Sequence, residues 1–203
     1  MIILADAELE LVPDEILNED DVKSIVKKEG RKNILLENCK MRRSIEKFFP
    51  KSSNRIGFPD IAYMFYRMNE ESAVMREMNI GYAIHTKMNI VIEDKDLRGI
   101  GPSYFEFKER VEEILSENHK KISLMEYLKS KGIEKNTVVL HPKGRRPLPR
   151  KTGISYVIGG FPQGDFVSNI SYLDLFSIHE EELTVPAVLE LLHFNLFLSS
   201  DYP

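Results

Sequence analysis

The stretch from Tyr156 to Phe166, YVIGGFPQGDF, ends an apolar, β-type run with two adjacent glycines and adds a third glycine at position 164. A strand that stops at Gly159 and Gly160 brings bare backbone to the end of a sheet, where α/β proteins usually bind their ligands. Taken alone, the same pattern is also typical of a tight turn that leaves a buried strand. The segments around it must decide between a turn and a ligand loop.

Strands and helices alternate along the 203 residues, which predicts an α/β fold with a largely parallel sheet. Strands are expected at 2–5, 33–37, 136–141, 154–160 and 174–179, and a hairpin at 80–86 and 89–94. Helices are expected between Pro13 and Gly30, at 42–49, 59–68, 103–117 and 123–132, and from about Leu183. Each of the last three strands ends in a loop that could line a site, so the ligand should bind in the final third of the chain.

The bulk composition is that of an ordinary soluble globular protein, with 42% apolar and 30% charged residues. Cys39 is the only cysteine, which excludes an internal disulfide and favours a reducing, intracellular setting. The N-terminus does not have the pattern of a signal peptide, and the apolar run 186–198 is too short to cross a bilayer. These features predict a cytoplasmic protein with no membrane segment.

The charge is unevenly distributed along a chain whose net charge is −4. Residues 6–21 hold eight acidic side chains and no basic one, whereas residues 40–55 and 143–151 each carry a local balance of +5. Two basic clusters on an acidic protein suit a local anionic partner such as RNA phosphate. Either cluster alone could equally be a solvated surface loop.

The residue spacing excludes several common kinds of site. The glycines at 159, 160 and 164 do not match the dinucleotide fingerprint, and too few residues follow them to complete a doubly wound nucleotide domain. No phosphate-binding loop ending in Gly-Lys-Ser/Thr occurs. The five histidines show no paired-ligand spacing, so no metal is expected, and Cys39 lies in no catalytic motif.

Four stretches in order carry a resemblance to a known family. They are RIGFPDIAY (55–63), NIGYAIHT (79–86), PSYFEF (102–107) and VIGGFPQGDF (157–166). Their sequence and spacing resemble the SPOUT-class methyltransferases, and in particular the ribosome-biogenesis family that methylates N1 of a pseudouridine in small-subunit rRNA. The resemblance covers nearly all 203 residues, and the compact chain is typical of an archaeal member.

The resemblance implies a SPOUT-type parallel sheet flanked by helices, with a C-terminal trefoil knot. It implies a single domain over 1–203, in which about 40–60 and 95–115 are RNA-facing additions and 136–203 form the knotted, cofactor-binding part. It also implies a homodimer. The final helix is apolar nearly all round, which demands burial on more than one side in a core or at a dimer interface.

S-adenosyl-L-methionine is the cofactor that the resemblance implies. The residues expected to bind it are Leu140, Gly159, Gly160, Gly164, Ser177, Ile178, His179 and Leu183. The glycines would let main-chain atoms approach the ligand, and the apolar side chains would wall the adenine. Asp60 is the catalytic candidate, because a carboxylate could accept the proton that the target nitrogen loses or orient the base. Asp60 could equally serve to stabilise the first turn of its helix.

The residues expected to contact RNA are Arg42, Arg43, Arg55, Arg98, Lys108 and Arg110. They would compensate for arginines of the family whose positions hold Phe58, Pro102 and Glu106 here. Two alternatives stay open. The chain could be a SPOUT methyltransferase for another RNA, such as a tRNA, or a largely non-catalytic RNA-binding factor of ribosome assembly.

Overall fold

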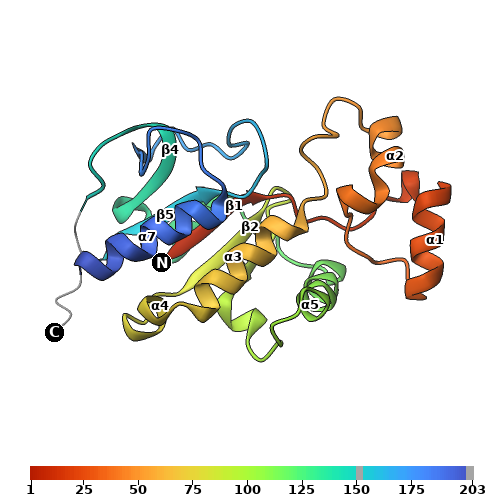
Figure 1. Ribbon diagram of the computed structural model, residues 1–203, viewed down its shortest axis with the longest axis horizontal. Helices are drawn as coiled ribbons and strands as arrows, with labels where there is room; N and C mark the ends of the chain where they lie inside the picture. Colours follow the sequence, from red (N-terminus) through yellow and green to blue (C-terminus); the bar gives the residue numbers. More distant parts are fainter. Residues whose placement is uncertain (150–152, 200–203) are drawn as a thin grey trace.

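The computed structural model describes residues 1–149 and 153–199 (Figure 1). Within them, six strands form one sheet in the order β3-β2-β1-β5-β4-β6. The strands are β1 (Ile2–Ala7), β2 (Tyr82–Thr86), β3 (Val91–Glu93), β4 (Thr137–Arg145), β5 (Ser155–Gly159) and β6 (Asp174–Phe176). Neighbouring strands are parallel except for the antiparallel hairpin of β2 and β3. The structure therefore confirms the predicted α/β class and the hairpin.

Strand β1 lies inside the sheet and is buried along its whole length. Its side chains alternate between two cores, with Ile2 and Leu4 on one face and Ile3 and Ala5 on the other. A continuous apolar run of this kind is typical of a parallel strand that is covered on both faces. The short run at the N-terminus thus sets the centre of a three-layer fold.

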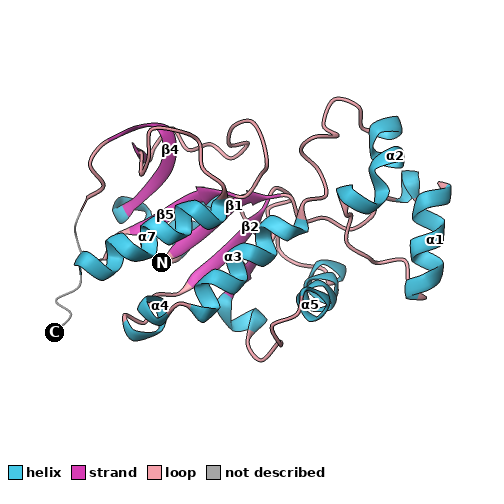
Figure 2. Ribbon diagram, viewed as in Figure 1, coloured by secondary structure: helices cyan, strands magenta, loops and turns pink. Residues whose placement is uncertain are grey.

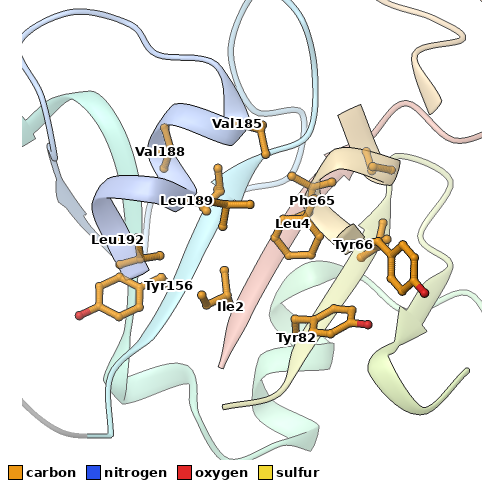
Figure 3. Packing of buried hydrophobic residues seen from close by; sticks show 14 of the residues in the cluster. Ile2, Leu4, Phe65, Tyr66, Tyr82, Tyr156, Val185, Val188, Leu189 and Leu192 are labelled. Atoms are coloured by element: carbon orange, nitrogen blue, oxygen red, sulfur yellow. The ribbon is translucent and has the colours of Figure 1, made fainter. Parts of the chain in front are cut away.

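Helices cover both faces of the sheet. The Ile2 face is covered by α3 (Pro59–Glu71), α4 (Ala73–Glu77), α5 (Tyr104–Ser116) and α7 (Val185–Ser199), and the other face by α6 (Leu124–Ser130). Figure 2 shows α3 and α7 crossing the strands on the same side. Figure 3 shows Leu189 and Leu192 of α7 directed toward the strand residues Ile2 and Tyr156.

Local signals in the sequence account for several helix ends. Pro59 occupies the first turn of α3, and Ser103 caps α5 by accepting a hydrogen bond from the Glu106 amide. Ser123 and Glu126 form the capping box expected from their spacing. Within the described part of the chain, three short 3-10 segments are also present: η1 (Asp14–Ile16), η2 (Asp94–Leu97) and η3 (Glu134–Asn136). The helix α4 was not predicted.

Residues 12–56, which we call the arm, stand apart from the sheet and carry α1 (Asp20–Glu29) and α2 (Asn38–Phe48) (Figure 1). The arm has its own small apolar core: Val12, Ile16, Val22, Ile34, Leu36, Met41, Ile45 and Ile56. Gly30 ends α1 with a φ of 69°, as its position in the sequence predicts.

The predicted strand at 33–37 is wrong. Leu35 forms only an isolated bridge with Leu11, flanked by two hydrogen bonds between backbone groups of 10–12 and 34–36. The predicted helix between Pro13 and Gly30 divides into η1 and α1, and α2 begins at Asn38, four residues before the predicted start. Among the described residues, no helix has the length and apolar character needed to cross a membrane.

Candidate active site

A pocket of about 620 Å³ opens at the carboxyl ends of β4, β5 and β6 and is bounded by the starts of α3 and α7. Its volume is in the range of pockets that hold a cofactor-sized ligand. A pocket is thus present where the sequence predicts the ligand site, in the final third of the chain, and one further segment contributes to it. The first turns of α3 contribute Asp60, Ile61 and Met64 to the wall from a distant part of the sequence.

Seven of the eight residues expected to bind the cofactor line this pocket: Leu140, Gly159, Gly164, Ser177, Ile178, His179 and Leu183. They come from three loops that are separated in sequence and brought together by the parallel order of β5, β4 and β6. Ser177 and His179 shape the third loop. The Ser177 hydroxyl donates to the His179 carbonyl, and His179 Nδ1 accepts from the Glu181 amide at 3.1 Å.

Gly160 has a different position from the one expected. It does not belong to the described lining of the pocket, and it packs on β1 instead. Its amide donates to the Ala5 carbonyl at 2.7 Å, and an added Cβ would lie 2.8 Å from both Ala7 Cα and Leu4 Cγ. Any side chain at position 160 would collide with the β1 backbone. Gly160 therefore allows the loop to pack directly on β1 where it leaves the sheet.

The loop that carries the glycines is fastened at its far end by Asp6, which the sequence did not reveal. The Asp6 carboxylate accepts hydrogen bonds from the Val167 amide at 2.7 Å, the Ser168 amide at 2.9 Å and the Ser168 hydroxyl at 2.6 Å. Asp6 itself has a φ of 54°, a conformation that costs energy in a non-glycine residue. The strained backbone turns the buried Asp6 carboxylate toward the end of the loop that carries the three glycines, which we call the glycine loop.

His141 and Asp165 join two walls of the pocket, the end of β4 and the glycine loop. His141 Nδ1 accepts from the Lys143 amide at 3.1 Å, so Nε2 carries the proton and donates to Asp165 at 3.2 Å. The Phe166 amide and, more weakly, His141 lower the pKa of Asp165. No pattern in the sequence predicts this pair. No group of three metal-ligating side chains is found within residues 1–149 and 153–199.

Asp60, the catalytic candidate, is exposed in the first turn of α3 and lies at the edge of the pocket. A carboxylate in this position can stabilise the helix N-terminus and face a bound substrate at the same time. The two interpretations of Asp60 drawn from the sequence are therefore compatible with each other.

The cations expected to contact RNA do not share one environment. Arg42 and Arg43 are exposed on α2, and Arg98 is exposed just after η2. Arg110 is partly buried, donates to the Asp96 carbonyl at 2.9 Å and pairs with Glu113 at 3.1 Å. Arg55 points inward and pairs with the buried Glu8 at 3.1 Å.

Lys108 is placed differently from the expectation of a surface contact with RNA. It is 3% exposed, and its ammonium pairs with Glu29, with Glu37 at 3.4 Å and with Glu112 at 3.5 Å. Burial opposes the charged form, but these carboxylates outweigh it and raise the pKa of Lys108. Lys108 therefore fastens the arm to α5 as a buried cation, since Glu29 and Glu37 belong to the arm.

Comparison with known proteins identifies the family. The family model described as EMG1/NEP1 methyltransferase matches residues 2–193. Two relatives, each named ribosomal RNA small subunit methyltransferase Nep1, come from Thermoplasma volcanium and Thermoplasma acidophilum. They are 33% and 31% identical, and each alignment covers 92% of both chains.

The crystal structure of Archaeoglobus fulgidus Nep1 bound to S-adenosylhomocysteine superposes with a TM-score of 0.83, at 18% identity, over 98% of this chain and 97% of that one. This likeness confirms the expected SPOUT-type arrangement of a mostly parallel sheet flanked by helices. The knot itself stays a prediction. From the match over residues 2–193 and the identity to the two relatives, the chain belongs to the EMG1/NEP1 methyltransferase family.

Proposed function

We propose that this chain transfers a methyl group from S-adenosyl-L-methionine to N1 of a pseudouridine in small-subunit rRNA during ribosome biogenesis. The observation that carries the proposal is the pocket at the ends of the last three strands, with Asp60 at its edge. The names of the Thermoplasma relatives support the class of RNA, and the ligand of the Archaeoglobus structure supports the methyl donor. The position on the base follows from the family resemblance.

The pocket residues fit the proposed donor. Leu140, Ile178 and Leu183 provide apolar walls for an adenine. Gly159 and Gly164 line the pocket too, but Phe161 and Arg55 fill the space that side chains at these two positions would need. When bound, S-adenosyl-L-methionine supplies an electrophilic methyl group on a sulfonium sulfur. The protein then has to hold the acceptor base in line with that methyl group, so positioning provides most of the rate acceleration.

The acceptor nitrogen must lose its proton as it forms the new bond to carbon. In our proposal the Asp60 carboxylate takes this proton or holds the base by a hydrogen bond to N1–H. The N1–carbon bond forms while the sulfur–carbon bond breaks, and S-adenosylhomocysteine is the second product. Asp60 suits this role because α3 presents it at the pocket edge, outside the walls assigned to the donor.

We further propose that 1–203 form one domain in which 136–203 include a trefoil knot. RNA would lie along the additions at 40–60 and 95–115, where Arg42, Arg43, Arg98 and Arg110 provide cations. Lys108 has no part in this surface because it is buried. A homodimer would form through α7, and the location would be cytoplasmic, where ribosomal subunits of an archaeal-type cell assemble.

The decisive experiment is methyl transfer to two RNA hairpins that differ only in having uridine or pseudouridine at the target position. We expect transfer to the pseudouridine hairpin alone. Asp60→Asn should reduce turnover by roughly 100-fold or more while leaving affinity for S-adenosylhomocysteine unchanged. Asp14→Asn, an exposed aspartate of the arm, is the control and should retain full activity.

The same measurements separate the alternatives. Methyl transfer to the uridine hairpin or to a tRNA would show that the chain acts on a different RNA target. RNA binding without any calorimetric signal for S-adenosylmethionine would instead favour a non-catalytic assembly factor. The observation that favours this second candidate is the presence of Phe58, Pro102 and Glu106 at positions where the family resemblance predicts arginine.

A further inference from the structure

Arg55 occupies the junction between the arm and the glycine loop of the pocket. Its Nε donates to the Glu8 carboxylate at 3.1 Å, and Glu8 is only 1% exposed. Glu8 also accepts a hydrogen bond from Lys87 at 2.5 Å. The Arg55 guanidinium is therefore held on one side by the buried Glu8 carboxylate, just after the end of β1.

The other side of the guanidinium rests on the glycine loop. Its central carbon lies 4.2 Å from the centre of the Phe161 ring, well within the range of a cation–π contact. An added Cβ on Gly164 would come within 2.8 Å of Arg55 Nη1, so Arg55 fills the space that a side chain at 164 would need. Arg55 thus contacts both residues of the loop that flank Pro162 and Gln163.

The contacts of Arg55 continue into the pocket through Phe161. The rings of Phe161 and Phe166 meet edge to face with their centres 5.3 Å apart, and both residues line the pocket. Arg55 does not belong to the described lining itself. Its side chain is 24% exposed, and one of its nitrogens, Nη2, is buried without a hydrogen-bond partner among the described residues. The Phe161 ring therefore links Arg55 to the wall of the pocket.

We propose that Arg55 is a positioning residue of the methyl-donor pocket, which shapes the loop 159–166 by holding Phe161 between the guanidinium and Phe166. This proposal rests on the proposed function only in that S-adenosylhomocysteine serves as one probe. A positioning role of Arg55 differs from a contact with RNA phosphate, because Arg55 would shape the loop even when no RNA is present. Glu8 and Lys87 extend the same chain of contacts from β1 and the β2–β3 hairpin to the pocket wall.

Two variants test the proposal, and both are measured without RNA. Arg55→Met removes the cation, and Phe161→Leu removes the ring while leaving the Glu8 pair intact. Each should weaken S-adenosylhomocysteine binding roughly tenfold. Each should also speed hydrogen exchange of the amides in 159–168 severalfold. The double variant should bind S-adenosylhomocysteine no more weakly than the more affected single variant, because both substitutions break the same Arg55–Phe161 contact. Arg55→Lys should recover part of the affinity.

Arg67→Met is the matched control, because Arg67 also pairs with a carboxylate, that of Glu71, and also faces an aromatic ring, that of Tyr66. All three residues lie on α3. It should leave ligand affinity and loop exchange unchanged. Unaltered exchange of 159–168 in Arg55→Met and Phe161→Leu would overturn the proposal. Faster exchange in both variants supports it, even if the wild-type chain binds no S-adenosylhomocysteine. That last result would reject the proposed function alone.

Discussion

Gly160 has room for a hydrogen atom and for no larger group, since the β1 backbone at Ala5 and Ala7 and the Leu4 side chain surround the position of its missing Cβ. We predict that Gly160→Ala lowers the free energy of unfolding by about 1–3 kcal/mol, because the loop must shift away from β1. The shift would also weaken binding of S-adenosylhomocysteine. Thermal unfolding and calorimetry measure the two effects.

Gly81→Ala is the control for this substitution, because its added Cβ would make only an ordinary contact of 3.4 Å with Asp94. Both the stability and the ligand affinity of that variant should stay close to the wild type. Equal behaviour of the two variants would show that Gly160 has no special packing role.

Two of the residues that the sequence failed to reveal are buried acids. Asp6 and Glu8 belong to a run of eight acidic residues that resembles a solvated surface, yet both are 1% exposed. Their partners Ser168 and Arg55 are 162 and 47 residues away in sequence. No local pattern encodes such pairs. The lining residues, in contrast, follow directly from strands that end in loops, so most of the pocket could be predicted.

Among the elements, helix α2 carries the exposed cations Arg42 and Arg43 on the arm. If they contact RNA phosphate, replacing both with alanine should reduce the slope of log affinity against log salt concentration by roughly 1.5. Fluorescence anisotropy of a labelled rRNA hairpin at several salt concentrations gives this slope. Lys27→Ala with Lys28→Ala, on α1 of the same arm, removes the same charge and should leave it nearly unchanged.

The β2–β3 hairpin is tied to α6 and its C-cap by Glu93, which accepts hydrogen bonds from Tyr127 at 3.0 Å and pairs with Lys131 at 2.5 Å. Burial opposes ionisation of Glu93, but Lys131, Lys95 and Tyr127 outweigh it and lower its pKa to about 2. A depressed acid pKa stabilises the fold above the unfolded pKa. That contribution should be lost as the pH falls from about 4.5 toward 2.

We therefore predict that Glu93→Gln is less stable than the wild type at pH 7 by roughly 2–3 kcal/mol. The difference should shrink below pH 4.5. Chemical unfolding between pH 7 and pH 3 measures it. Glu113→Gln, which removes a surface carboxylate that is 62% exposed, should show no such trend. A difference that stayed constant with pH would exclude the ion-pair explanation.

Element prediction from the sequence succeeded where a segment could be judged by its own pattern and failed where tertiary contacts decided. The apolar run at 33–37 has the composition of a strand. The arm, however, pairs it only with 10–12, so it forms a bridge and no ladder. Helix α4 was missed because its five residues follow α3 after the single residue Ser72, whose side chain caps the new helix.

At the scale of the whole molecule, the parallel order of the strands explains why one pocket gathers residues from 60 to 188. Three strands deliver their loops to one edge of the sheet, and α3 and α7 lie together across the same face and close the pocket (Figure 2). The arm projects from this body and is tied back to it by ion pairs in two places. Lys108 and Glu112 of α5 pair with Glu37 and Arg31 of the arm, and Arg55 of the arm pairs with Glu8 near the glycine loop.

Helix α7 buries Leu189, Leu192 and Leu196 against the sheet, yet its outer side is also apolar. Leu191, Phe194 and Leu198 are 37%, 59% and 55% exposed, and their spacing of three and four residues places them in one stripe. An exposed apolar stripe of this kind is typical of a surface that contacts another protein. The second copy expected from the family resemblance is the partner that fits it.

We predict that Phe194→Glu weakens the proposed dimer at least roughly thirtyfold, because a carboxylate would lose its hydration in the centre of an apolar interface. Size-exclusion chromatography with light scattering over a range of concentrations measures the change. Phe105→Glu on α5 is the matched control, since Phe105 is also 59% exposed and α5 lies far from α7 (Figure 1). A wild-type chain that stayed monomeric, or equal dimerisation of both variants, would remove α7 as the interface.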